Sequence, residues 1–284
     1  MKRAKINIVT VSDKLMKPLM VITGAASGLG AELTKQALIA GYHVLAIVRN
    51  KSSFKNSTAS ENSALHILQL DLNRHDCGEV LQEKLAVMLN DGFSLKALIF
   101  NAGEHHCSTI EEHPLEDAKR LFDTNFFSVL RCLQEVLPLI RERGEAQIWA
   151  TSSLSAHMGL PSDGLYAASK AALERLFESL RLELEPFGID VGLLVPSTFE
   201  SRLMRQEQVV SENSSCDQAQ RTGSTSTPGK SVTILASRFL EILKGTPESF
   251  RYPGDSKAEA ILDQLYVDFG IQRLGLAKQW SDRN

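Results

Sequence analysis

Cysteine is scarce in this chain of 284 residues, and aromatic residues make up only 6% of it. The four cysteines, Cys77, Cys107, Cys132 and Cys216, include no CxxC pair and are too few for a disulfide framework, so we expect reduced thiols and no zinc ribbon. No stretch approaches the roughly 20 apolar residues that span a bilayer, and the short apolar run over 6–11 lacks a cleavage site. These absences predict a soluble, cytoplasmic protein without a membrane span.

A surplus of one charge sign is also missing. Lys and Arg number 31, Asp and Glu number 34, and the net charge is −3. A chain this close to neutral has no general electrostatic attraction for phosphate backbones or anionic lipids, which argues against nucleic acid and membrane surfaces as partners. Hydrophobic residues at 43% and charged residues at 23% are ordinary for a folded protein.

Short apolar runs alternate with longer amphipathic stretches from Leu19 onward. This alternation predicts an α/β fold, a single doubly wound parallel sheet of the Rossmann type with helices on both faces. The expected strands cover 19–23, 43–48, 65–70, 97–100, 147–151, 190–195 and 250–253. The expected helices cover 29–40, 77–89, 115–143, 163–187, 232–243 and 257–269.

No internal repeat and no linker between two cores is present, so we predict one domain over 19–284 behind an N-terminal extension of residues 1–18. Residues 211–230 have almost no apolar content, which predicts a mobile substrate loop over 197–230. Residues 231–284 are then expected to form a C-terminal cap.

A glycine-rich turn joins the first expected strand to the first expected helix. It contains Gly24, Ser27, Gly28, Leu29 and Gly30. Glycines at this point allow a tight turn and the close approach of a pyrophosphate, whose charge is met by free N–H groups at the helix N-terminus. Because strand, turn and helix occur in the required order, the pattern predicts a dinucleotide site rather than a turn without a ligand.

The choice of cofactor is indicated by the end of the second strand, at Val48 and Arg49. An acidic residue at this place, about 20 residues past the glycines, would bind the ribose 2′-OH of NAD. A guanidinium instead suits a 2′-phosphate, so NADP is predicted over NAD, with Ser27 adding a hydroxyl contact. An exposed arginine without a ligand remains the alternative.

Tyr166 and Lys170 stand one helical turn apart, so a phenol and an ammonium share one face of a helix. The ammonium favours the phenolate, which brings a group that titrates near pH ~10 towards neutral pH and suits it to general acid or base catalysis. Such a pair alone is common among surface neighbours. Here Ser153 precedes the tyrosine by thirteen residues, at the end of the fifth strand, where open α/β sheets bind ligands.

The TGxxxGxG turn, the serine and the YxxxK pair together resemble the short-chain dehydrogenase/reductase family. The resemblance extends over about 19–196, and the stretches MGLPSDGLYAASKAALE and RYPGDSKA are most similar to the hydroxysteroid and retinol dehydrogenase branch. It implies an NAD(P)-dependent enzyme acting on CH–OH groups, possible assembly as a homodimer or homotetramer, and four catalytic residues. These are Asn125, Ser153, Tyr166 and Lys170.

The same resemblance implies further cofactor contacts. Asp71 would lie near the adenine, Leu72 is also expected to contact the cofactor, and Asn101 would line the adenosine side. Two motifs depart from the family pattern: Phe100 replaces the first asparagine of NNAG, and Ser197 and Ser201 replace the glycine and threonine of PGxxxT. The complete expected set is Gly24, Ser27, Gly28, Leu29, Gly30, Arg49, Asp71, Leu72, Asn101, Ala102, Gly103, Tyr166, Lys170 and Pro196.

Two further patterns in the sequence allow other interpretations. Glu104, His105, His106 and Cys107 suggest a metal site, but no two histidines have the i, i+4 spacing of a metalloprotease helix, so a polar loop and no metal are expected. Sugar epimerases and dehydratases share YxxxK, but usually with a TGxxGxxG turn that is missing here.

We therefore predict an NADP-dependent oxidoreductase that interconverts a carbonyl and an alcohol on a hydrophobic small molecule, with the tyrosine as general acid or base. The alternative from another class is a non-catalytic dinucleotide-binding redox sensor. The four expected catalytic residues favour the enzyme, because a sensor has no need for all of them.

Overall fold

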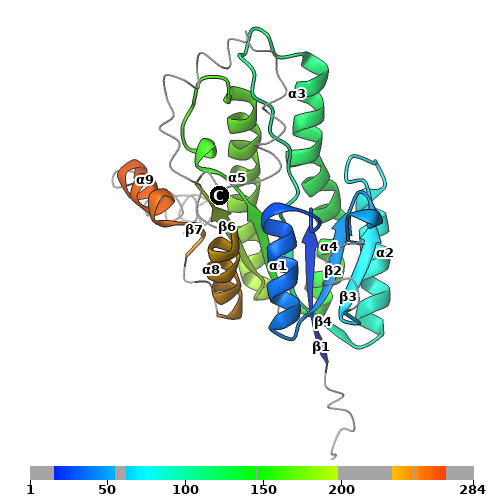
Figure 1. Ribbon diagram of the computed structural model, residues 1–284. Helices are drawn as coiled ribbons and strands as arrows, with labels where there is room; N and C mark the ends of the chain where they lie inside the picture. Colours follow the sequence, from blue (N-terminus) through cyan, green and yellow to red (C-terminus); the bar gives the residue numbers. More distant parts are fainter. Residues whose placement is uncertain are drawn as a thin grey trace, which may run out of the picture.

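A parallel sheet forms the centre of the molecule (Figure 1). The computed structural model describes residues 16–54, 62–144, 146–197, 232–245, 247 and 249–266. Within these ranges the strands are β1 Lys17–Thr23, β2 His43–Val48, β3 Leu65–Gln69, β4 Phe93–Phe100, β5 Gln147–Thr151, β6 Asp190–Val195 and β7 Arg251–Pro253. Their order is β3-β2-β1-β4-β5-β6-β7, and every neighbouring pair is parallel.

The strands are nearly continuous apolar runs because helices cover both faces of the sheet. Within β1, for example, the five residues from Leu19 to Thr23 are all buried. On one face α1 (Gly28–Ile39) and α8 (Val232–Lys244) pack side by side over one core cluster, with Trp149 of β5 fully buried in it.

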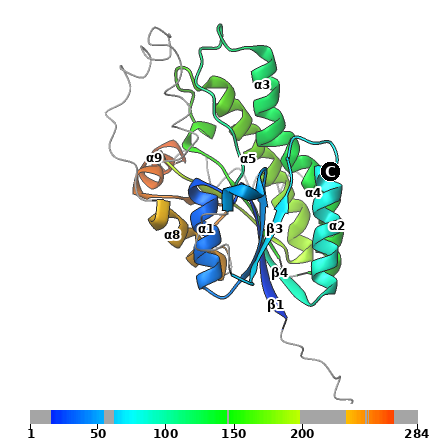
Figure 2. The same cartoon turned by 45° about the vertical axis from the view of Figure 1, so that its right-hand side comes forward.

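The opposite face carries α2 (Cys77–Asn90), α4 (Ser128–Arg143) and α5 (Gly164–Leu184) over a second core cluster (Figure 2). Shorter elements lie at the strand ends and at the rim of the sheet. They are the 3-10 turns η1 (Lys51–Phe54), η3 (Leu154–Ala156) and η4 (Glu185–Phe187), and the helices α3 (Leu115–Phe122) and α9 (Ser256–Tyr266).

The predicted fold class is confirmed, and most element bounds agree within a few residues. Two differences have a physical cause. The helix expected over 115–143 contains a π-helical segment, η2 (Asp123–Phe127), which buries Thr124 and Asn125. Strand β4 begins four residues early, because polar Ser94 and Lys96 interrupt the apolar run that sequence periodicity follows.

Other expectations concern residues outside the described ranges. The N-terminal extension up to residue 15, the substrate loop from 198 to 230 and the end of the cap from 267 onward lie there. Within the described ranges, no helix combines the length and apolar character needed to cross a bilayer.

The expectation of reduced thiols holds at two positions. Cys77 and Cys132 are buried and free, with their Sγ atoms 4.0 Å apart between α2 and α4. At Cys107 the expectation is wrong, because this cysteine is disulfide-bonded. Cys216 lies outside the described residues. Cysteine spacing could not predict this, since it carries no information on which distant segments meet.

Candidate active site

The four expected catalytic side chains come together at the carboxyl edge of the sheet. Ser153 follows β5, Tyr166 and Lys170 lie on α5, and Asn125 belongs to the π-helical segment η2. Parallel strands end at one common edge, and this is where open α/β sheets bind their ligands. The fold thus brings together residues that are up to 45 positions apart in the chain, as the first and last of these four residue numbers show.

Lys170 is held in a buried position beside Tyr166. Its ammonium lies 5.8 Å from the centre of the Tyr166 ring and donates a 2.8 Å hydrogen bond to the carbonyl oxygen of Thr151, at the end of β5. Burial disfavours the ammonium and lowers the pKa of Lys170 to about 8, while the Glu174 carboxylate opposes this shift. A buried ammonium therefore lies next to the phenol ring, at the end of β5.

Asn125 fixes the loop that follows β4. Its Nδ2 donates to the backbone oxygen of Glu104 at 2.9 Å, and its Oδ1 accepts from the backbone N–H of the same residue at 2.8 Å. Nδ2 also donates to Ser169 Oγ at 3.0 Å, and Ser169 donates to the carbonyl of Tyr166. The π-helical segment therefore ties the β4 loop to the helix that carries the tyrosine.

Ser153 has extended backbone, with φ −158°, and starts the 3-10 turn η3. Its Oγ accepts from the backbone N–H of Ser155 at 3.2 Å. The residues before and after Ser153 are both bound to the end of β6: Ser152 N donates to Leu194 O, and Leu154 N donates to Pro196 O. This attachment sets the position of the Ser153 hydroxyl relative to β6.

His105 and Asp163 form a pair next to the tyrosine that sequence reasoning missed. His105 Nε2 lies 2.5 Å from Asp163 Oδ1, and the imidazole meets the Tyr166 ring edge to face with centroids 4.4 Å apart. The sequence predicts only that His105 belongs to a polar loop. The two partners are 58 residues apart, so no local pattern could have found them.

The glycine turn after β1 packs tightly against itself and against the end of β4. Gly24 has φ +64°, and a Cβ there would lie 2.8 Å from the Cα of Ala102. A Cβ on Gly30 would lie 2.3 Å from Gly24 O and 2.6 Å from Asn101 Nδ2. Helix α1 begins at Gly28 and has no acidic residue in its first turn, so nothing there repels an anion.

The structure places the remaining expected cofactor residues at the neighbouring strand ends. Thr23 Oγ1 accepts hydrogen bonds from the backbone N–H groups of Asn101 and Ala102, which connects the β1 and β4 ends. Asp71 Oδ1 accepts from the backbone N–H of Asn73, and the carbonyl of Leu72 accepts from Arg131. Both residues therefore have local structural contacts in the loop after β3.

Ser197, at the position of the glycine in the family motif, has a partner of its own. Its backbone N–H and its hydroxyl both donate to Asp255 Oδ2, at 3.1 and 2.6 Å. Burial opposes ionisation of Asp255, but these hydrogen bonds and those from the backbone of Ala258 and Lys257 lower its pKa. The serine thus anchors the chain after Pro196 to the start of α9.

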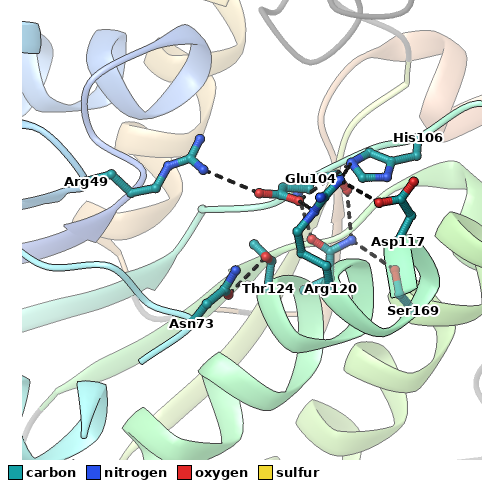
Figure 3. Close-up of polar contacts among 9 residues, drawn as sticks. Arg49, Asn73, Glu104, His106, Asp117, Arg120, Thr124 and Ser169 are labelled. Atoms are coloured by element: carbon teal, nitrogen blue, oxygen red, sulfur yellow. Dashed lines mark hydrogen bonds and ion pairs between the residues drawn. The ribbon is translucent and has the colours of Figure 1, made fainter. Parts of the chain in front are cut away.

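Arg49, which follows β2, and Glu104, which lies in the loop after β4, form an ion pair (Figure 3). Arg49 Nη1 lies 3.5 Å from Glu104 Oε1, and the Arg49 side chain is 74% exposed. Arg120 and His106 approach the other carboxylate oxygen at 3.5 and 3.6 Å. Because β1 lies between β2 and β4, this contact passes over the strand that leads into the glycine turn.

We expect Gly30→Ala to destabilise the fold and to abolish dinucleotide binding. The added methyl would overlap backbone atoms of Gly24, which cannot move aside as a side chain can, and overpacking of this kind costs about 1 to 3 kcal/mol. Thermal unfolding and NADPH titration would measure both effects. Gly159→Ala is the matched control, since a Cβ there meets nothing within 4 Å; equal behaviour of the two variants would contradict the assignment.

Comparison with known proteins identifies the family. The model of the short chain dehydrogenase family matches residues 18–210. An uncharacterized oxidoreductase of Bacillus subtilis, YusZ, is 34% identical over 196 residues, covering 66% of this chain and 67% of that protein. Retinol dehydrogenase 8 of Bos taurus is 33% identical over 200 residues, covering 66% of this chain and 62% of that protein.

Solved structures agree on the fold. A short-chain dehydrogenase from Streptomyces avermitilis superposes with a TM-score of 0.76 at 24% identity, covering 94% of this chain and 98% of that one. A second, from Burkholderia cenocepacia in complex with NADP, has a TM-score of 0.71 at 24% identity over 89% and 94% of the two chains. The chain therefore belongs to the short-chain dehydrogenase family, whose members are NAD(P)-dependent oxidoreductases acting on CH–OH groups. This confirms the predicted family, fold class and enzyme class.

Proposed function

We propose that this protein is an NADPH-dependent carbonyl reductase, or the corresponding alcohol dehydrogenase, for an apolar small molecule. The observation that carries the proposal is the buried Lys170 ammonium beside Tyr166, at the strand edge that also holds Ser153 and the glycine turn. An apolar substrate is supported by the similarity to retinol dehydrogenase 8, which covers 62% of that protein.

The residues of the site divide the chemistry between them. When bound at the glycine turn, the nicotinamide cofactor supplies or accepts the hydride. Tyr166 holds the proton that a carbonyl oxygen takes up on reduction, and Lys170 favours the phenolate that remains. Ser153 orients the oxygen of the substrate by a hydrogen bond. Asn125 keeps the β4 loop and α5 together through Glu104 and Ser169, so the tyrosine keeps its place relative to the β4 loop.

Loss of NADPH absorbance over a panel of retinoid, steroid, aliphatic and quinone carbonyls tests this function. Turnover with at least one apolar carbonyl supports it. Tight NADPH binding without turnover on any member of the panel, or on the matching alcohols with NADP, would instead favour the dinucleotide-binding sensor. The sensor and the enzyme are thus separated by measuring binding and turnover on the same preparation.

We expect NADPH to bind more tightly than NADH, and Arg49→Ala to remove most of the preference. A guanidinium paired with a 2′-phosphate is worth about 1.5 to 3 kcal/mol, roughly tenfold or more in affinity. Titration of both cofactors by intrinsic fluorescence measures the ratio of the two dissociation constants. Equal affinities in the unaltered protein would contradict the role of Arg49.

Glu104→Gln is a control that should change the affinity for NADPH in the opposite direction from Arg49→Ala. Its carboxylate competes with the 2′-phosphate for Arg49, and an exposed pair of this kind is worth up to about 1 kcal/mol. The amide should therefore improve NADPH binding by about two- to fivefold while leaving NADH binding nearly unchanged. Weaker NADPH binding in this variant would mean that Glu104 positions Arg49 rather than competing for it.

A further inference from the structure

A fully buried carboxylate, Glu174, lies one helical turn beyond Lys170 on α5 and belongs to none of the expected site residues. Its side chain is 1% exposed. Ser152 Oγ donates to its Oε1 at 2.6 Å, and Arg251 Nε donates to its Oε2 at 2.7 Å. His157 Nε2 lies 3.0 Å from the same Oε1. A carboxylate is costly to bury, and here it has partners from the β5 turn and from β7.

Glu174 and Lys170 bind adjacent residues at the end of β5. Lys170 donates to the carbonyl oxygen of Thr151, and Glu174 accepts from the hydroxyl of the next residue, Ser152. Both side chains project from one face of α5, since residues four apart lie on the same side of a helix. Two consecutive residues at the end of β5 are therefore held by α5, directly before the Ser153 hydroxyl.

This unit holds two cationic groups and one carboxylate. Lys170 and Arg251 contribute positive charge, and Glu174 contributes the carboxylate between them. Without Glu174, two cationic groups would remain in a poorly solvated region, and the ammonium is the one that can lose its proton. Although burial acts against it, the pKa of Glu174 is lowered by its contacts with His157, Arg251 and Ser152, so the carboxylate is charged at neutral pH.

We propose that Glu174 is a positioning residue of the active site, which keeps the Lys170 ammonium charged and holds the turn of Ser153 against α5. It acts through Lys170 and Ser152 and is not assigned a contact with substrate or cofactor. The inference rests on the proposed role of Tyr166 and Lys170, and deepens it. A charged Lys170 in turn favours the Tyr166 phenolate, so removal of the Glu174 charge makes the phenol harder to ionise.

Several other charged or titratable groups lie near Lys170 and Glu174. Among the described residues, those that face Lys170, Glu174 or their immediate partners are Tyr166, His157, Arg251, Glu178, His105 and Asp163. Glu178 lies one turn further along α5, 3.8 Å from Arg251 Nη2, and also pairs with Arg175. Glu178 contacts Arg251, and in the described part of the chain it forms no hydrogen bond or ion pair with the β5 turn, so Glu178→Gln is the matched control.

The test measures the ionisation of Tyr166 directly, by the near-ultraviolet absorbance of phenolate across an alkaline titration of the full-length chain. Each variant is compared with the same variant carrying Tyr166→Phe, so that the other three tyrosines cancel. In Glu174→Gln we expect the midpoint of Tyr166 to rise by about one pH unit, a tenfold change in proton affinity. Glu174→Asp should restore most of the shift, and Glu178→Gln should leave the midpoint unchanged.

An unchanged midpoint in a folded Glu174→Gln protein would overturn the proposal. Thermal unfolding and NADPH titration establish whether that variant is folded. If it is not, Arg251→Gln decides. Removal of the Arg251 charge relieves its repulsion of the Lys170 ammonium, so Lys170 stays charged to higher pH and the Tyr166 midpoint should fall; an unchanged or raised midpoint would overturn the proposal. The titration needs no substrate, so failure of the carbonyl panel and failure of this inference are distinguishable.

Discussion

Tyr166→Phe should lower turnover by about 10² to 10⁴ while leaving the fold and NADPH binding close to those of the unaltered protein. The substitution removes only the hydroxyl, so the ring keeps its edge-to-face contact with His105 and its place beside Lys170. What is lost is the proton that the carbonyl oxygen needs as it accepts hydride. Steady-state kinetics on the best carbonyl from the panel, with NADPH titration alongside, measure the separation of turnover from binding.

His105→Phe is the control for the ring contact. It keeps an aromatic side chain against Tyr166 and removes the interaction with Asp163, so it tests packing without removing the phenol. We expect its effect on turnover to be much smaller than that of Tyr166→Phe. Turnover by Tyr166→Phe within about tenfold of the unaltered enzyme would reject the phenol as the proton donor, since general acid catalysis contributes more than that.

Lys170→Met should cost a similar factor in turnover without the loss of stability that usually follows a change in the core. Burial lowers the pKa of Lys170 from 10.5 to about 8, which corresponds to about 3 kcal/mol of unfavourable free energy at neutral pH. Methionine removes this penalty, although the carbonyl of Thr151 loses its donor, which costs about 1 to 3 kcal/mol. The two terms nearly cancel.

The sign of the pH dependence follows from the same shift. Between about pH 8 and 10.5 the unfolded chain binds the Lys170 proton and the folded chain does not, so this residue adds stability as pH rises through that window. Chemical denaturation at neutral pH and near pH ~10 should therefore show a smaller rise for Lys170→Met than for the unaltered protein. An equal rise in both would contradict the shifted pKa.

Leu173→Ala supplies the comparison on the same helix. Leu173 is 2% exposed in the core beneath α5, and a truncation of this kind costs about 2 to 5 kcal/mol. Its turnover, measured well below its melting temperature, should change little. If Lys170→Met destabilised the protein as strongly as Leu173→Ala, the lysine would be a structural residue whose loss disrupts the helix, and its catalytic assignment would lose its support.

The sequence by itself determined the features that depend on local pattern. Apolar runs located the buried strands, and β2, β5 and β6 begin and end where the alternation predicted, because a strand covered on both faces must be apolar throughout. The glycine turn could be recognised because Gly24 needs φ +64° and Gly30 leaves no room for a Cβ. The Tyr166–Lys170 pair could be recognised because its spacing is one helical turn.

Only the tertiary structure decided which distant groups meet. The π-helical turn at Asn125, the His105–Asp163 pair and the Arg49–Glu104 contact leave no periodic trace in the sequence. From the sequence, Glu174 is one more charged residue on a helix. In the structure it is buried, and its charge is paired with Arg251, which lies 77 residues later on β7. Periodicity records which face of an element is apolar, whereas the partner of a buried charge is set by strand order, and strand order is a property of the whole sheet.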